Sequence, residues 1–380
     1  MKKILLPFAF LISVLINLSA QTMQTENEHY MLIGTYTSGK SEGIYVYKFN
    51  TATADFAHVS TIKSPNPSFL AVSPDRQFVY AVYEEGNNNK GGSVAAFRFD
   101  KQTGKLTMLN QQLSGGDHPC YVAIDKTGKW VAAGNYTGGS AAILPVKEDG
   151  SLGEAITVMQ HTGSGVNKSR QEKPHVHATV FSKDNRFLFV PDLGTDKVMI
   201  YAFDEKTGKL AEAKQPFAKS KDGSGPRHID FHPNNKYAYL MEEMSGTVVV
   251  YAHGNGKLTP LQRISSLPKD FKGDIGSADI HISPDGKFVY ASNRLGSNSI
   301  AIFKVNPQNG KLSLVDIQSS LGLIPRNFNF DPSANFLLVA NQNSDYIVVF
   351  KRNKQTGLLT DTGKRIEVGK PVCIKWIPVR

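Results

Sequence analysis

The sequence predicts an all-β protein, a seven-bladed β-propeller with four-stranded antiparallel blades. Two observations lead to this prediction: a short motif recurs seven times at intervals of about 50 residues, and no helical period follows residue 20. Each copy begins at an anchor, usually proline, and continues with alternating apolar and variable residues. The seven anchors are Pro67, Pro119, Val176, Pro226, Ser277, Pro325 and Pro371.

Each copy of the motif predicts four strands in a fixed order. In the copy that starts at Pro67, apolar alternation over 70–72 predicts an inner strand with one buried face. A Pro-Asp turn leads to a second apolar segment at 78–82, and a polar loop leads to a third at 94–97. A turn that contains Gly104 precedes the fourth strand. Four strands per repeat are typical of a propeller blade.

The phase of the repeats predicts how the ring closes. The first strand after the N-terminal tail, 30–34, matches the second strand of a repeat, and 44–47 and Phe56 match the third and fourth. The inner strand that this blade lacks occurs at the other end of the chain, over 372–376. We therefore expect the C-terminal strand to pair with the N-terminal strands, because closure removes exposed sheet edges.

Residues 1–20 have the pattern of a cleaved export signal. Lys2 and Lys3 precede an apolar run over 4–16, and the small residue Ala20 stands at the expected cleavage point. The run is too short for a membrane span, which needs about 20 apolar residues. We expect an exported, periplasmic protein, or a cytoplasmic one if this signal is misread.

The rest of the chain is expected to form one domain. A flexible tail is predicted over 21–29, and the unbroken repeats predict a single propeller over 30–380. The chain has 43 Lys and Arg against 33 Asp and Glu, which gives a formal net charge of +10. Its lysines are scattered over predicted turns, so we expect no nucleic-acid partner. The expected form is a monomer without a membrane span.

Two columns of residues are predicted to meet at one mouth of the central channel. The inner strands line the channel, and adjacent antiparallel strands place the start of the first beside the end of the second. The residue after each anchor is, in order, Ser68, Cys120, His177, Arg227, Ala278, Arg326 and Val372. The residue at the end of each second strand is Tyr36, Glu84, Tyr136, Leu193, Glu243, Arg294 or Gln342.

Charged and titratable groups in these columns make this mouth the candidate site. His177, Arg227, Glu243, Arg294 and Arg326 are expected to converge there. Unpaired charge is costly in a semi-enclosed place, so such a gathering is more typical of functional sites than of cores. Simpler interpretations remain open at this point: Arg227 and Glu243 as an ion pair between strands, and the residues one position earlier, including Asn293, as turn caps.

Five phrases resemble the seven-bladed lactonase family, in the order in which that family has them. This family includes bacterial 6-phosphogluconolactonases and fungal carboxymuconate cyclases. The phrases cover 33–37, 174–177, 225–228, 292–294 and 339–345. The resemblance implies hydrolysis or formation of a small-molecule lactone in the channel pocket, without a metal or cofactor. The implied function is therefore a lactone hydrolase of the 6-phosphogluconolactonase type.

By the same resemblance, His177, Glu243, Arg227 and Arg294 match the proposed catalytic set of the family. His177 is expected to transfer the proton and Glu243 to orient water or an arginine, although the exchanged roles stay open. A Glu242-Glu243 pair stands where an Asn-Glu pair is expected, which leaves open which glutamate points inward. The expected substrate-binding residues are His175, which also competes with His177 for the histidine role, and His228, Arg326, Asn293 and Gln342.

Three other functions are weighed against hydrolysis. A metal-dependent lactonase would bind calcium through Asp192, Glu243 and asparagines, but nearby arginines would oppose a cation. The second is a non-catalytic propeller that binds a sugar acid or a protein. The third is a muconate-type lactonizing cycloisomerase. An export signal also conflicts with a phosphorylated substrate that stays in the cytoplasm, so the identity of the lactone is left open.

Overall fold

The structure, a computed structural model, describes residues 27–86 and 91–379. The predicted export signal over 1–20 and most of the predicted tail over 21–29 lie outside the described residues. Strand β1 begins at Glu28, so the last residues assigned to the tail belong to a sheet. Within the described residues, no helix has the length and hydropathy of a membrane span.

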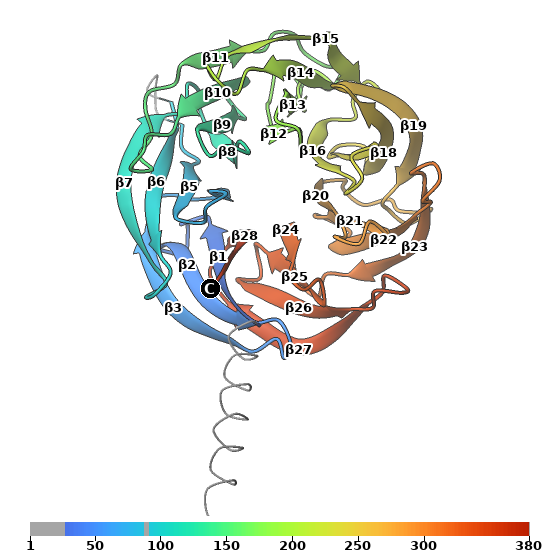
Figure 1. Cartoon of the computed structure of the whole chain (residues 1–380). Coiled ribbons are helices and arrows are strands. Elements are labelled where there is room, and N and C mark those ends of the chain that lie inside the picture. The colour runs from blue at the N-terminus through green and yellow to red at the C-terminus, as the bar shows by residue number, and fades with distance from the viewer. Residues whose placement is uncertain (1–26, 87–90, 380) are drawn as a thin grey trace, which may run out of the picture.

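The described residues form seven four-stranded antiparallel sheets around a central channel, as predicted (Figure 1). The strands of each blade are given from the channel outward. The first blade consists of β28 (Pro371–Pro378), β1 (Glu28–Thr35), β2 (Gly43–Asn50) and β3 (Phe56–Lys63). The second consists of β4 (Leu70–Val72), β5 (Phe78–Tyr83), β6 (Ser93–Asp100) and β7 (Lys105–Leu113). The third blade consists of β8 (Pro119–Ile124), β9 (Trp130–Asn135), β10 (Ser140–Pro145) and β11 (Thr157–Gln160). The fourth consists of β12 (Val180–Phe181), β13 (Phe187–Asp192), β14 (Lys197–Phe203) and β15 (Leu210–Lys219). The fifth blade consists of β16 (Pro226–Phe231), β17 (Tyr237–Glu242), β18 (Thr247–Gly254) and β19 (Lys257–Ser265). The sixth consists of β20 (Ser277–Ile282), β21 (Phe288–Asn293), β22 (Ser299–Val305) and β23 (Leu312–Ser319). The seventh consists of β24 (Pro325–Phe330), β25 (Phe336–Asn341), β26 (Tyr346–Arg352) and β27 (Leu359–Glu367).

The two ends of the propeller chain close the ring in one blade, which confirms the prediction from repeat phase. β28 pairs antiparallel with β1, with Ile33 opposite Ile374 and Met31 opposite Trp376. β1 then pairs with β2, and β2 with β3. Each of the seven described blades therefore has four strands, and the blade that joins the two ends of the chain has an inner strand like the others.

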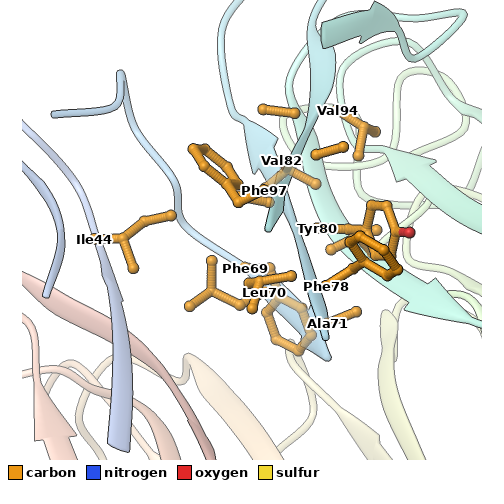
Figure 2. Close-up of a cluster of buried hydrophobic side chains, with 14 of the residues drawn as sticks. Ile44, Phe69, Leu70, Ala71, Phe78, Tyr80, Val82, Val94 and Phe97 are labelled. Carbon is orange, nitrogen blue, oxygen red and sulfur yellow. The ribbon is translucent and has the colours of Figure 1, made fainter. Parts of the chain in front are cut away.

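Alternating side chains fill the spaces between neighbouring blades. Figure 2 shows part of one buried cluster, in which Ile44 from β2 joins Leu70, Tyr80 and Phe97 of the next blade. All four side chains are fully buried. Replacing a buried phenylalanine such as Phe97 by alanine typically costs about 3–5 kcal/mol. Packing between blades therefore holds the inner strands, and the residues they carry, in a rigid ring.

The inner strands contain irregularities that matter for the channel. The register shifts between Pro226 and His228 where β16 pairs with β17, and it shifts in the same way between Pro119 and Tyr121 and between Pro325 and Asn327. A β-bulge leaves one residue unpaired and re-aims its side chain. In each case the unpaired position is the residue after the anchor.

One predicted inner strand is much shorter than expected. The alternation at Thr179 and Phe181 predicts a strand through both, but β12 holds only Val180 and Phe181, and Val176 makes a single bridge to Asp192. Val176, which stands in place of the anchor proline, is flanked by His175 and His177, whose side chains make contacts described below. Around Val176, these side-chain contacts determine the path of the chain more than backbone hydrogen bonds to the neighbouring strand do.

Candidate active site

The bulges place cationic side chains at one mouth of the channel. Arg227 lies at the bulge of β16 and Arg326 at the bulge of β24. Arg227 is 1% exposed, which makes it one of the largest fully buried side chains of the described residues. Its Nη1 donates to the carbonyl oxygen of Ala278 on the neighbouring blade at 2.7 Å. The guanidinium is therefore held across two blades.

Glu243 is the centre of this mouth. It directly follows β17, and its backbone N–H donates to Gly225 O at 2.7 Å, so the chain turns at the channel rim. Its carboxylate contacts three guanidinium groups: Arg227 Nε lies 3.0 Å and Arg294 Nη2 2.9 Å from Oε2, and Arg170 Nη2 lies 2.6 Å from Oε1. One carboxylate thus organises three cations.

The excess of positive charge shifts the protonation equilibria in this cluster. Burial alone would raise the pKa of Glu243, but Arg294, Arg227 and Arg170 lower that pKa to about 2. Burial and the neighbouring Arg294 and Arg326 lower the pKa of Arg227 to about 10. At neutral pH Glu243 is a carboxylate and Arg227 is charged. The cluster carries more positive than negative charge, so it favours an added anion.

Of the two candidate histidines, His177 reaches Glu243. His177 Nε2 lies 4.0 Å from Glu243 Oε2, and Nδ1 lies 3.6 Å from the Sγ of Cys120. Burial, Arg227 and His228 lower the pKa of His177 well below its ordinary value. The imidazole is neutral at physiological pH and can accept a proton.

His175 has a supporting position instead. Its ring stacks on Tyr136 at 4.5 Å between centroids, and Nδ1 lies 3.0 Å from Tyr136 O. Its Nε2 lies 3.1 Å from Glu172 Oε1. Tyr136 in turn accepts a bond from Arg170 Nη2 at 3.2 Å. His175 therefore holds the wall of the site, and its ring nitrogens are already occupied.

Asn293 and Gln342 do not join the charged cluster. Asn293 is buried, its Oδ1 accepts from Ser277 Oγ at 2.6 Å and Ser266 Oγ at 2.7 Å, and its amide donates to Ser266 O at 2.8 Å. Its hydrogen bonds are those of a turn cap that ties loops together, and its contact with a substrate stays a prediction. Gln342 is half-buried, and its amide contacts Asn343 Oδ1 at 3.3 Å at the rim. Both residues lie where a second strand ends, and the loop that follows sets the direction of their side chains.

The question of the two glutamates is settled by their partners. Glu242 is the last residue of β17 and binds Arg263, with Nη1 2.9 Å from Oε1, on the outer side of the blade. Ser245 Oγ donates to its other oxygen at 2.9 Å. Glu243 is therefore the glutamate that lies with Arg227, Arg294 and His177 at the channel mouth.

Arg326 lies on the opposite wall of the channel, together with Tyr36, Glu84 and Ser68. The sequence analysis placed these three residues in the two columns at the channel mouth but gave them no role. Its guanidinium lies over the ring of Tyr36, 5.4 Å from the centroid. Tyr36 OH donates to Glu84 Oε2 at 2.9 Å, and Ser68 Oγ donates to the same oxygen. This wall carries one carboxylate and one guanidinium, so its charges are balanced.

Sequence reasoning missed Arg170. It lies in the long connection between β11 and β12, outside the repeating strands, and its side chain is 43% exposed. The one available signal was spacing: the interval between the anchors Pro119 and Val176 is the longest of the series. Extra loop length in one repeat of a propeller is a place to look for site residues.

Below the rim lies a narrow cavity enclosed by the inner strands. It is lined by Ser68, Phe69, Cys120, His177, Arg227, His228, Arg326, Asn327 and Val372. Cys120 and Cys373 are buried free thiols. Among the described residues, no group of three or more His, Cys, Asp or Glu side chains is arranged to hold a metal ion.

This arrangement has a definite chemical capacity. Neutral imidazole next to guanidinium groups can accept a proton from water while the guanidinium groups stabilise a developing oxyanion. Arginines also bind carboxylate or phosphate through paired N–H donors. The site therefore suits attack of water on an acyl carbon in an anionic or polyhydroxylated molecule.

Comparisons with known proteins agree with the geometry. The sequence profile of the family described as "Lactonase, 7-bladed beta-propeller" matches residues 30–376. A 6-phosphogluconolactonase of Bacillus subtilis is 40% identical over 349 residues, which cover 91% of this chain and 97% of that protein. A 6-phosphogluconolactonase of Formosa agariphila is 42% identical over 334 residues, which cover 87% of this chain and 94% of that protein.

A solved structure is similar over nearly the whole chain. The periplasmic gluconolactonase of Pseudomonas aeruginosa superimposes with a TM-score of 0.88 at 38% identity. The match covers 93% of this chain and 100% of that one. The fold and the length of the described propeller are therefore shared with this structure.

Proposed function

The chain belongs to the seven-bladed β-propeller lactonase family, and from that membership we propose that it hydrolyses a sugar-derived lactone at the Glu243 mouth of its channel. The observation that carries the proposal is the contact of one carboxylate with three guanidinium groups beside the neutral imidazole of His177. Hydrolysis of a lactone needs both parts: a proton acceptor for the attacking water and fixed positive charge for the oxyanion.

Each residue of the proposed set has a distinct role. His177 transfers the proton, because its lowered pKa keeps the ring neutral. Arg227 and Arg294 stabilise the oxyanion or hold the anionic group of the substrate. Glu243 orients these arginines; since they hold its pKa at about 2, its carboxylate is a weak proton acceptor. Of the two roles that remained open for Glu243, orientation is the one that its charge environment supports.

The proposed substrates are 6-phosphogluconolactone and gluconolactone. The names of the relatives support this choice, since two are 6-phosphogluconolactonases and one is a gluconolactonase. Arg326, on the wall opposite Glu243, is proposed as a further substrate contact. The proposed reaction uses no metal or cofactor, because three arginines at the rim would repel a cation.

Export to the periplasm is also proposed, with a monomer as the working form. The pattern of 1–20 supports export, and the Pseudomonas aeruginosa gluconolactonase is described as periplasmic. A periplasmic enzyme would meet unphosphorylated gluconolactone more readily than a phosphorylated sugar. Cell fractionation with N-terminal sequencing checks this: a mature N-terminus near Gln21 is expected, and an intact Met1 in the cytoplasm would contradict export.

A lactone panel tests the activity itself. Acid release from both lactones is followed at constant pH, with and without a chelator, for the wild type and for Glu243→Gln. We expect turnover that the chelator leaves unchanged and a loss of about 10²-fold or more in kcat/KM for the variant. A folded wild type without turnover on any lactone, or a fully active Glu243→Gln, would remove the proposal.

A further inference from the structure

A second histidine of the cavity is bound by a buried aspartate. His228 on β16 lines the cavity below the rim, and its Nδ1 lies 2.7 Å from Asp279 Oδ1 on the next blade. On its other side, Nε2 lies 3.3 Å from Arg227 Nη1. Tyr121 and Phe69 contact the ring edge to face, at 5.3 and 6.0 Å between centroids. The imidazole is thus held in place on every side.

The partners of His228 determine which nitrogen carries its proton. An arginine N–H can only donate, so Nε2 must present its lone pair toward Arg227. A carboxylate can only accept, so Nδ1 must carry the proton toward Asp279. The same tautomer follows from both contacts. It aims the basic nitrogen at the cavity and at the guanidinium that the proposed mechanism uses.

Asp279 is a carboxylate built to stay charged. It also accepts from His281 Nε2 at 3.1 Å, from the backbone N–H of Ile280 at 3.0 Å and from the amide of Asn327. Burial alone would raise the pKa of Asp279, but His281 and His228 hold that pKa well below its ordinary value. The aspartate can therefore stabilise an imidazolium at His228 without taking the proton itself.

A second histidine–aspartate pair in the chain shows what is special about the first. His161 Nδ1 lies 2.7 Å from Asp192 Oδ2, the same separation as in the His228 pair. Its Nε2, however, is occupied by Tyr201 OH at 2.9 Å, and the pair lies among strand ends and loops outside the cavity lining. The same contact between Nδ1 and a carboxylate thus has a structural role in the His161 pair. In the His228 pair, the far nitrogen contacts Arg227, a residue of the proposed mechanism, and the side chains of His228 and Arg227 both line the cavity.

We propose that His228 is a second catalytic histidine, the general base that takes the proton from the attacking water, with Asp279 as its positioning residue. The proposal rests on the lactone hydrolysis proposed above. It divides two proton transfers between two rings whose centroids are 5.3 Å apart: His228 serves the water, and His177, next to Glu243, serves the leaving ring oxygen.

The reaction balances with these two groups. Water oxygen bonds to the carbonyl carbon of the lactone as one of its protons moves to His228 Nε2, and the oxyanion forms against Arg227 or Arg294. Collapse breaks the bond between the carbonyl carbon and the ring oxygen. The ring oxygen then takes one proton that His177 relays from solvent, and the proton on His228 is released to solvent, so that protons balance. One lactone and one water give one hydroxy acid, with both rings neutral again at the end.

The charge environment of His228 sets its pH response. The groups that face it from the neighbouring elements are Arg227, Asp279, His281, His177 and Tyr121. Burial and Arg227 lower the pKa of His228 to about 4, against the opposing effect of Asp279. The ring is therefore unprotonated, and available as an acceptor, throughout the physiological range.

Kinetics of three variants on the full-length protein test the proposal. His228→Gln and Asp279→Asn should each lower kcat for gluconolactone on the order of 10²–10⁴-fold, with KM changed by less than about threefold. The matched control His161→Gln, which breaks the other pair, should keep kcat within about twofold. Retention of more than half of wild-type kcat by folded His228→Gln overturns the assignment, as does an equal loss in His161→Gln.

A spectroscopic readout keeps the proposal testable if a variant does not fold. Nitrogen-15 NMR of the histidine rings of the wild type at pH 7 should show His228 with Nδ1 protonated and Nε2 bare. A protonated Nε2 would exclude a base at this position. The two proposals fail differently: a wild type without lactone turnover removes the hydrolase function, whereas an active wild type with an active His228→Gln removes only this inference.

Discussion

Two arginine–carboxylate groups in this propeller are built in opposite ways. Arg352 at the end of β26 binds Asp285 of the neighbouring blade through Nη2, at 3.1 and 2.9 Å from the two carboxylate oxygens. Its Nε donates to Tyr290 OH at 3.1 Å, and its guanidinium lies 5.4 Å from the ring centroid of Phe330. Here one cation meets one anion, and aromatic rings surround the guanidinium. At the channel mouth, in contrast, Glu243 is shared by three arginines.

The difference teaches how a structural ion pair is told from a site. In the blade, the charges of Arg352 and Asp285 cancel and the remaining donors reach fixed acceptors, so the pair joins two blades. In the channel, Arg227 and Glu243 are buried and Arg294 is 13% exposed, so positive charge exceeds negative charge even without the more exposed Arg170. Such an excess costs stability unless an anion arrives. An excess of buried positive charge therefore distinguishes the candidate site from a structural ion pair. The number of ion pairs does not distinguish them.

The largest effect that would sharpen this contrast is on catalysis. Replacing Arg227 by lysine keeps the charge but loses the planar fork that reaches Glu243 and Ala278 O. We expect kcat/KM to fall by about 10²–10³-fold with little change in the melting temperature. Steady-state kinetics and thermal unfolding measure the two quantities. A variant that loses stability and keeps its activity would make Arg227 equivalent to Arg352.

The opposite pattern is expected for the blade pair. Arg352→Leu removes a buried cation and leaves Asp285, which is 28% exposed, without its partner. Because water reaches the carboxylate that is left behind, breaking this pair should lower the free energy of unfolding by about 1–2 kcal/mol, with kcat and KM unchanged. Chemical denaturation and kinetics on the same preparation check this. Loss of turnover in a folded Arg352→Leu would contradict the division into structural and functional regions.

A third effect separates the regions by pH. The pKa of His228 is about 4 in the folded protein and about 6.5 in an unfolded chain, so between these values the unfolded state binds more protons. Stability therefore falls with falling pH, by about 2 kcal/mol between pH 7 and 5, and His177 acts in the same direction. His281 has a raised pKa, so its opposite contribution changes above pH 6.5 and does not offset this loss.

The measurement is denaturation at a series of pH values. His228→Gln should flatten the curve between pH 7 and 5, whereas Arg352→Leu should lower the whole curve without changing its slope there. Below about pH 4.5, Glu243 adds a further loss as the pH approaches its folded pKa of about 2. An unchanged slope in His228→Gln would mean that this imidazole does not titrate between the two states as described.

The smallest effect concerns an added anion. Phosphate should bind the channel mouth and raise the melting temperature by a few degrees, which corresponds to about 1 kcal/mol. Arg294→Gln should reduce this rise. The control Arg365→Gln, at an outer pair in which Arg365 Nη1 lies 2.8 Å from Asp361 Oδ1, should not. An equal rise in all three proteins would show that phosphate acts on the surface in general.

Much of the fold and part of the site could be predicted because they depend on repetition along the chain. The spacing of the anchors and the alternation of apolar residues indicated the blades and the pairing of β28 with β1. They also indicated the common mouth of Arg227, Glu243 and Arg294. Strand phase determines on which face and at which end a residue lies, and phase is a property of sequence order.

Tertiary structure decided everything that lies beyond the strand ends. Arg170 comes from a loop with no period, Asn293 turns toward serines of two loops, and the tautomer of His228 depends on an aspartate of the next blade. The sequence alone determined that seven like sheets close around a channel with charged residues at one mouth. The bulges, the loops and the contacts between blades determine which of these charged residues contact one another. Side-chain direction at these places depends on neighbours that are distant along the chain.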